Sequence, residues 1–119
     1  MTKEELEDRT AQLAARVVKV CEALPSKRIG AAHFADQLFR SGTGVAANYS
    51  EATEAESRKD FIHKLKIAMK ELSETRTWLK IIAFAGYIDM RKLKPLIAET
   101  IELTRIFASS VKTARLKAR

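Results

Sequence analysis

The strongest constraint on the fold is a run of apolar and small residues between positions 61 and 82 that recur at steps of four and three. Its members are Phe61, Leu65, Ala68, Leu72, Thr75, Leu79 and Ile82. This spacing places all of these side chains along one face of an α-helix. Ser57 is a good N-cap, and the carboxylate of Asp60 favours the positive end of the helix dipole. The pattern predicts a helix over residues 58–86, which would be ~43 Å long at about 1.5 Å per residue.

The same spacing recurs in residues 3–24, 28–53 and 90–115, which we therefore predict to be helical. The expected buried faces are Leu6, Thr10, Leu13, Val17, Val20 and Leu24; Ala31, Ala35, Leu38, Gly42, Val45, Tyr49 and Ala52; and Leu93, Ile97, Thr100, Thr104, Phe107 and Val111. The connections between these helices are short, so successive helices must run antiparallel. We predict a single all-α domain over residues 1–119, an antiparallel up-down-up-down four-helix bundle that needs no metal or cofactor to fold.

Local signals mark several helix ends. Thr2 with Glu5 has the spacing of a capping box, Pro25 ends the first helix, and Asp89 is a good N-cap for the last one. Pro95 leaves two alternatives open. Either residues 90–94 form a separate turn before the main helix, or the helix continues through Pro95 with a kink.

Two glycines, Gly42 and Gly44, lie inside the predicted helix over residues 28–53. Each should cost on the order of 1 kcal/mol relative to alanine. The favoured explanation is the close approach of a neighbouring helix. A phosphate-binding loop is rejected, because the segment lacks the Gly-Lys-Ser/Thr ending of a P-loop.

Composition agrees with a packed helical protein and excludes several other classes. The chain is 46% hydrophobic and 31% charged, with four Gly and two Pro. Its longest apolar run, residues 81–85, is far shorter than the about 18–20 residues of a membrane span. The N-terminus is acidic and polar, unlike a secretory signal. We expect a soluble, cytoplasmic protein whose lone cysteine, Cys21, is buried rather than reactive.

The predicted helix over residues 58–86 carries more apolar surface than one bundle core is expected to cover. A second line with the same spacing consists of Ile67, Glu71, Glu74, Trp78, Ile81 and Ala85, and Phe84 lies on a third face. Wide apolar surfaces on soluble proteins usually mark interfaces. We therefore expect the C-terminal half of this helix to pack against another copy of the chain.

Positive charge is concentrated in the second half of the chain. Residues 1–57 hold seven Lys or Arg and nine Asp or Glu, a net −2, whereas residues 58–119 hold fifteen and six, a net +9. Such a field attracts phosphate backbones without reading sequence. The alternative is a solvated surface that maintains solubility. The candidate nucleic-acid-binding residues are Lys59, Lys64, Lys66, Lys70, Arg76, Lys80, Arg91, Lys92, Lys94, Lys112, Arg115 and Lys117.

No catalytic constellation is apparent. His33 and His63 are the only histidines, and no Glu-x-x-His pair is present to build a di-iron site. Glu71 and Glu74 are one helical turn apart, which suits partners of Arg40 or of a neighbouring lysine better than paired acid–base carboxylates. We expect no enzymatic activity, no metal and no cofactor; an uncharacterised hydrolase is the remote alternative.

Residues 38–52 (LFRSGTGVAANYSEA) followed by residues 57–79 (SRKDFIHKLKIAMKELSETRTWL) carry a family resemblance that continues through Gly86-Tyr87-Ile88. These segments resemble bacterial four-helix-bundle proteins encoded within intervening sequences of 23S rRNA genes. The resemblance implies a homopentameric barrel. A related accessory protein of diversity-generating retroelements contacts nucleic acid and a reverse transcriptase through a basic surface. The chain departs from many relatives at Gly44, where serine is expected.

The resemblance also implies roles for residues that match the family's polar pattern. These are interpreted as helix-packing and assembly contacts: Arg40, Ser41, Asn48, Glu51, Asp60, Glu71 and Glu74. Trp78 and Ile81 of the second line, and Phe84 of the third face, are further candidates for such contacts. The leading hypothesis is a non-enzymatic homo-oligomer that binds RNA or DNA through basic surfaces. The alternative is a structural or protein-interaction ring that docks a partner such as a reverse transcriptase. A membrane partner is not expected.

Overall fold

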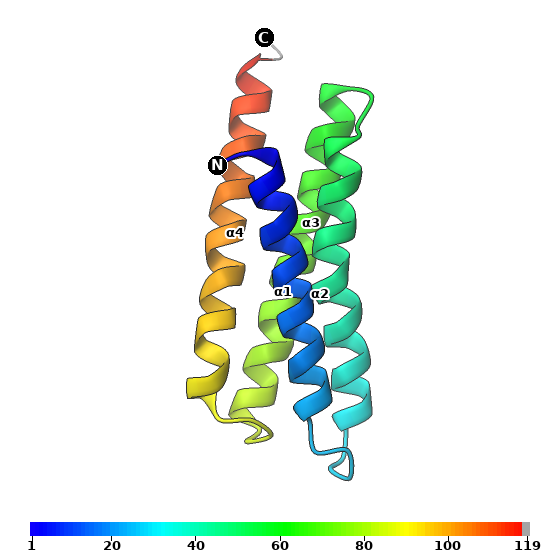
Figure 1. Ribbon diagram of the computed structural model, residues 1–119, viewed down its shortest axis with the longest axis vertical. Helices are drawn as coiled ribbons and strands as arrows, with labels where there is room; N and C mark the ends of the chain where they lie inside the picture. The colour runs from blue at the N-terminus through cyan, green and yellow to red at the C-terminus, as the bar shows by residue number, and fades with distance from the viewer. Residues whose placement is uncertain (118–119) are drawn as a thin grey trace.

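The computed structural model describes residues 1–117; residues 118 and 119, which include Arg119, one of the fifteen Lys or Arg of residues 58–119, lie outside the described residues. Within the described part, four α-helices follow one another: α1 (Lys3–Ala23), α2 (Ala31–Thr53), α3 (Arg58–Phe84) and α4 (Met90–Lys117). Neighbouring helices run in opposite directions (Figure 1). The predicted all-α four-helix bundle is confirmed.

Side-chain caps fix the helix starts that the sequence predicted. The hydroxyl of Thr2 accepts a hydrogen bond from the backbone N–H of Glu5 at 3.1 Å, and the hydroxyl of Ser57 accepts one from Asp60 at 3.0 Å. At the start of α4, the carboxylate of Asp89 accepts from the N–H of Arg91 at 2.8 Å. Each bond satisfies an N–H group that has no partner within its own helix.

Other helix ends differ from the prediction by a few residues. Helix α2 begins at Ala31 instead of residue 28, because Gly30 adopts a left-handed conformation with φ of 80°. Helix α3 ends at Phe84 instead of residue 86. There Gly86, with φ of 76°, donates to the carbonyl of Ala83, and Tyr87 donates to that of Ile82, each at 3.0 Å. This is the Schellman motif, which ends helices at a left-handed glycine.

Pro95 lies inside α4, which runs continuously from Met90 to Lys117 and so extends beyond the predicted end at residue 115. No separate turn precedes the helix. The missing N–H of Pro95 would have bonded to the carbonyl of Arg91, four residues earlier. Both residues are exposed, so solvent can satisfy that carbonyl.

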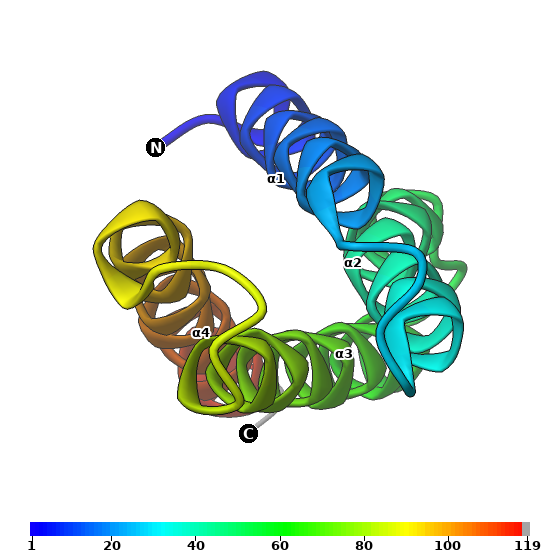
Figure 2. The same cartoon turned by 90° about the horizontal axis from the view of Figure 1, so that it is seen from below.

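Viewed along its axis, the bundle places the helices around the core in chain order (Figure 2). Helices α1 and α4 pack against each other less closely than the other neighbours do. They are joined by Arg9 and Glu99, whose side chains form a bidentate ion pair with both N···O distances at 2.8 Å. The molecule is elongated, with extents of 53 × 22 × 21 Å.

The predicted buried faces form the core with few exceptions. Leu13, Leu38 and Leu72 are completely buried, and the rings of Tyr49 and Phe107 stack 5.4 Å apart across the bundle. Fully burying a leucine stabilises the fold by about 1.5–3 kcal/mol. Helix α4 differs in detail: Leu96, Leu103 and Ala114 are buried although the prediction omitted them, and Thr104, which it included, is only half-buried.

The second apolar line of α3 faces α2 of the same chain over much of its length. Trp78 is half-buried, with its ring 5.6 Å from His33 and 5.9 Å from Phe34, both on α2. Helix α2 therefore covers part of Trp78 within the same chain, and the packing of this line against a second copy stays a prediction. Ile81 and Phe84 remain exposed, by 37% and 79%.

The loops at one end of the bundle are tied together. Arg28, between α1 and α2, donates to the carbonyls of Gly86 and Ala85 at 3.1 and 3.2 Å, and its guanidinium lies 3.9 Å from the ring centre of Tyr87. The Tyr87 hydroxyl in turn donates to the carbonyl of Ile29. The opposite end holds the α2–α3 loop, the start of α1 and the end of α4 (Figure 1).

Candidate nucleic-acid interface

An open groove with a volume of ≈ 680 Å³ lies between α3 and α4, in the half of the bundle that carries the chain termini. Helix α3 contributes Lys66, Met69, Lys70, Ser73 and Arg76 to its lining. Helix α4 contributes Thr104, Ala108, Val111, Lys112, Arg115 and Leu116. The groove is thus formed by two neighbouring antiparallel helices, without residues of α1 or α2.

Sequence spacing explains why these side chains line one groove. Positions 66, 69, 73 and 76 of α3 are separated by three or four residues, and so are positions 104, 108, 111 and 115 of α4. Each set therefore forms a stripe along one side of its helix. Both stripes lie beside the buried face, so the packing that forms the core also brings the stripes together.

The groove is strongly cationic. Lys66, Lys70, Arg76, Lys112 and Arg115 line it, and no carboxylate does. None of the five forms an ion pair with another residue of the described chain. All except the half-buried Arg76 are exposed. Their charge is thus directed to solvent and is open to an anionic ligand.

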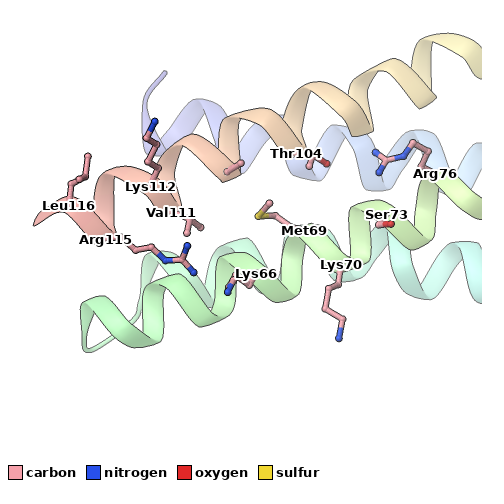
Figure 3. Close-up of a pocket in the computed structure, with 11 residues that line it drawn as sticks. Lys66, Met69, Lys70, Ser73, Arg76, Thr104, Val111, Lys112, Arg115 and Leu116 are labelled. Atoms are coloured by element: carbon pink, nitrogen blue, oxygen red, sulfur yellow. The ribbon is translucent and has the colours of Figure 1, made fainter. Parts of the chain in front are cut away.

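The lining side chains divide into a floor and a rim (Figure 3). Met69 of α3 and Val111 of α4 point into the space between the two helices, and Arg115 extends from α4 toward α3. Lys70 and Lys112 point away from that space on opposite sides. The centre of the groove is therefore apolar, and cations flank it along both helices.

The remaining predicted cations do not line this groove. The amine of Lys64 lies 3.2 Å from Glu51, and the guanidinium of Arg91 lies 2.8 Å from Asp89. Hydrogen bonds from the side chain and backbone of Arg91 lower the pKa of Asp89. The others are exposed elsewhere on α3 and α4: Lys59, Lys80, Lys92, Lys94 and Lys117. The structure thus unites five of the twelve candidates in one place.

Most of the predicted packing and assembly residues lie between α2 and α3 of the same chain. Arg40 is 2.5 Å from Glu74 and 3.6 Å from Glu71. The buried hydroxyl of Thr75 donates to Ser41 at 2.9 Å. Asn48 donates to the carbonyl of Gly44 within α2, and the backbone N–H of Asp60 donates to the cap of α3. The contacts of Arg40 and of Thr75 hold α2 and α3 together within one chain, whereas those of Asn48 and Asp60 are local to one helix.

Glu71 is the least satisfied group of this polar cluster. Its Oε2 atom is buried and has no hydrogen-bond partner within the described chain. Burial, and then the nearby charge of Glu74, raise the pKa of Glu71, whereas Arg40 and Lys70 act in the opposite direction. Because the carboxylate keeps only part of its hydration and receives no direct donor at Oε2, its ionisation is less favourable than in water.

Sequence reasoning missed the apolar floor of the groove. Met69, Ala108 and Leu116 were assigned no role, although Leu116 is 60% exposed. The available signal was the sequence Lys66 to Arg76, in which cations alternate with Met69 and Ser73 at helical spacing. The sequence does not indicate which stripe of α4 lies opposite this stripe of α3.

The described residues contain no group of three or more His, Cys, Asp or Glu that could hold a metal ion. The same part of the chain has no helix with the length and hydropathy needed to cross a bilayer. Cys21 is half-buried and donates to the carbonyl of Ala35 at 3.3 Å.

Residues 3–109 match the model of a protein family described as 23S rRNA-intervening sequence protein. The chain belongs to this family. The match extends over all of α1 to α3 and much of α4, so the resemblance seen in two segments of α2 and α3 holds for most of the bundle. It ends before Val111, Lys112, Arg115 and Leu116, which complete the groove on α4.

A solved structure supports this membership. A protein of unknown function from the S23 ribosomal protein family of Bacteroides thetaiotaomicron is 31% identical in sequence, with a TM-score of 0.85. The alignment covers 94% of this chain and 99% of the other. A comparison with curated proteins finds no match. Membership of the 23S rRNA-intervening sequence family is therefore established without a function that could be transferred from a relative.

Proposed function

We propose that this protein is a non-enzymatic, homo-oligomeric helical bundle that binds RNA or DNA through basic surfaces. The observation that carries the proposal is the groove between α3 and α4, which is lined by five cations and no carboxylate. Nucleic acids release condensed counterions when Lys and Arg neutralise their phosphates, and this supplies most of the affinity of non-specific binding.

The proposed binding does not read base sequence. The groove lining includes no Asn, Gln, Asp or Glu, the side chains that recognise adenine and cytosine edges in pairs of hydrogen bonds. Its lysines are flexible point charges that suit phosphates of any sequence. The lining hydroxyls, Ser73 and Thr104, have no histidine or carboxylate beside them in the lining to act as a base, which supports a non-enzymatic role.

Assembly is part of the proposal. Phe39 is 49% exposed, Ile81 37% and Phe84 79%, and large apolar side chains that are this accessible suit contacts between copies. The family resemblance favours a homopentameric barrel. A ring would present several basic grooves to one nucleic acid strand, which raises the overall affinity through effective concentration.

The test is binding of a labelled oligonucleotide, measured by fluorescence anisotropy across a salt series. The logarithm of the affinity should fall linearly with the logarithm of salt concentration, with a slope of about −0.7 to −0.9 per phosphate contact. Absence of binding at low salt would refute the proposal. Light scattering on the same sample gives the subunit number, and a lone 13.4 kDa particle would refute the assembly.

A matched pair of variants locates the interface. Lys66→Gln/Lys70→Gln/Arg115→Gln removes three groove cations, and Arg16→Gln/Lys19→Gln/Lys27→Gln removes the same charge from exposed positions in or next to α1. The groove variant should lose most of the affinity and reduce the salt slope by about two to three. Equal losses of affinity in both variants would indicate that binding depends on net charge alone and has no defined interface.

A second candidate is a structural or protein-interaction ring, favoured by the exposed residues at the tied end of the bundle. Ile29 is 93% exposed there, and Phe84 closes α3. A protein such as a reverse transcriptase could dock on this end. Binding of a purified partner that survives nuclease treatment and is lost in Ile29→Asp/Phe84→Asp, but kept in the groove variant, would favour this function over the first.

A further inference from the structure

The α3–α4 groove has an apolar floor that phosphate binding does not require. Met69 and Val111 form its centre, and Leu116 extends it at the end near the termini. Leu116 is 60% exposed and Met69 is half-buried, so part of this apolar surface contacts solvent. A surface that served only to attract phosphates would be expected to carry polar groups here. The floor therefore bears on which form of nucleic acid the groove accepts.

A duplex fits this arrangement poorly. Its bases are stacked inside and its phosphates lie outside, so it could engage the rim cations but would leave the apolar floor unused. A single strand exposes base faces, which proteins bind on apolar side chains and on Arg guanidinium planes while cations track the backbone. Arg76 and Arg115 supply such planes at the two ends of the α3 stripe, where Arg115 reaches toward α3.

We infer that the groove binds single-stranded RNA or DNA in preference to duplex, with bases on the Met69–Leu116 floor and phosphates on the flanking lysines. This inference rests on the proposed function and specifies its ligand. The stripe from Lys66 to Arg76 covers eleven residues of α3, and the ten steps between them give a length of ~15 Å at about 1.5 Å per residue.

The groove lining contains no Phe, Tyr or Trp, and this limits the expected preference for single strands over duplex. Stacking on aromatic rings contributes more per base than contact with aliphatic side chains does. The preference for single strands should therefore be about tenfold rather than several hundredfold. It should persist at high salt, because contact with the floor releases no counterions.

The experiment compares three fluorescent probes that carry the same number of phosphates: oligo(dT), oligo(rU) and a DNA hairpin duplex. Wild-type protein should bind both single strands about tenfold more tightly than the hairpin. Met69→Ser/Leu116→Ser removes the floor without changing charge. It should lose this preference and leave hairpin affinity and the salt slope unchanged. Ile101→Ser, an exposed apolar position on α4 outside the groove, is the matched control and should behave as wild type.

Circular dichroism verifies that each variant remains helical. Equal affinity of wild type for single strands and hairpin would overturn this inference and leave the proposed function intact. Failure of every nucleic acid probe at low salt would overturn both. If an acidic amphipathic peptide bound the groove while the nucleic acids did not, the site would be one for protein, which also overturns the inference.

Discussion

A Cβ atom on Gly42 would lie 2.7 Å from Cγ1 of Val17, a distance that real Cβ atoms do not adopt. Gly42 is buried in α2, and Val17 is completely buried in α1. Helices α1 and α2 can thus approach each other closely at this point because Gly42 has no side chain. This close approach explains a glycine in a helix interior, where it otherwise destabilises.

Gly42→Ala should destabilise the bundle. Overpacking of a core typically costs about 1–3 kcal/mol, which exceeds the roughly 1 kcal/mol that alanine gains in helix propensity. Urea unfolding followed by circular dichroism measures the change. In Val17→Ala both contacting methyl groups are gone, but the Cβ of residue 17 remains 2.9 Å from the added Cβ, so the same Gly42→Ala substitution should cost less than in wild type. A loss of equal size in both backgrounds would show that Val17 is not the obstacle.

Gly44→Ala should have the opposite sign. The added Cβ would lie 3.1 Å from the carboxyl carbon of Glu71, which is the end of a flexible side chain and can move by the few tenths of an ångström required. The gain in helix propensity is then retained, up to about 1 kcal/mol. The same urea titration tests this. Destabilisation comparable to that of Gly42→Ala would mean that Arg40 holds the carboxylate of Glu71 rigidly in place.

Glu71→Gln should stabilise the protein more at neutral than at acid pH. Because the folded-state pKa of Glu71 is raised above 4.5, the unfolded chain releases this proton first as pH increases. Stability is thus lost as pH rises from the unfolded-state pKa through the folded-state pKa. The difference in unfolding free energy between variant and wild type should shift toward the variant between about pH 4 and pH 7. A shift toward wild type would mean that attraction to Arg40 outweighs burial.

Gly86→Ala should cost about 1 kcal/mol, entirely through the backbone. Its φ of 76° is strained for a residue with a Cβ, yet no atom lies within 4 Å of the position that the Cβ would occupy. Thermal unfolding can compare this variant with Gly86→Asn, because asparagine tolerates the left-handed conformation better. Asparagine should recover part of the loss. Equal destabilisation by both would point to a contact instead of to φ.

The helical fold could be predicted from the sequence because the buried face is a local pattern. Steps of three and four identify which side of each helix faces inward, and the short connections leave one simple topology. Contacts between side chains of different helices are harder to predict from the sequence. The apolar line through Trp78 was expected to pack against another subunit, but the indole also lies beside His33 and Phe34 of α2, an arrangement that depends on the distance and rotation at which α2 and α3 pack.

The sequence predicted which residues of the candidate site are charged, but not how their side chains are arranged. Lys64 and Lys66 are equivalent in the sequence, yet one pairs with Glu51 and the other lines the groove. The difference arises from the 100° rotation between successive helical positions, which directs the two side chains toward different neighbouring helices. Likewise, Gly42 and Gly44 looked alike, but one contacts a valine of α1 and the other a carboxylate of α3.

The asymmetry between the two ends of the bundle has a consequence for local opening. Arg28 and Tyr87 clamp the loops at one end, whereas the other end is held across α3 and α4 by the bond from Arg58 to the carbonyl of Lys117. Amide hydrogens in the first turns of α3 and the last turns of α4 should therefore exchange with solvent soonest. Lys112, Arg115 and Leu116 lie in those turns, so a ligand that spans both helices would slow exchange at the end that otherwise frays first.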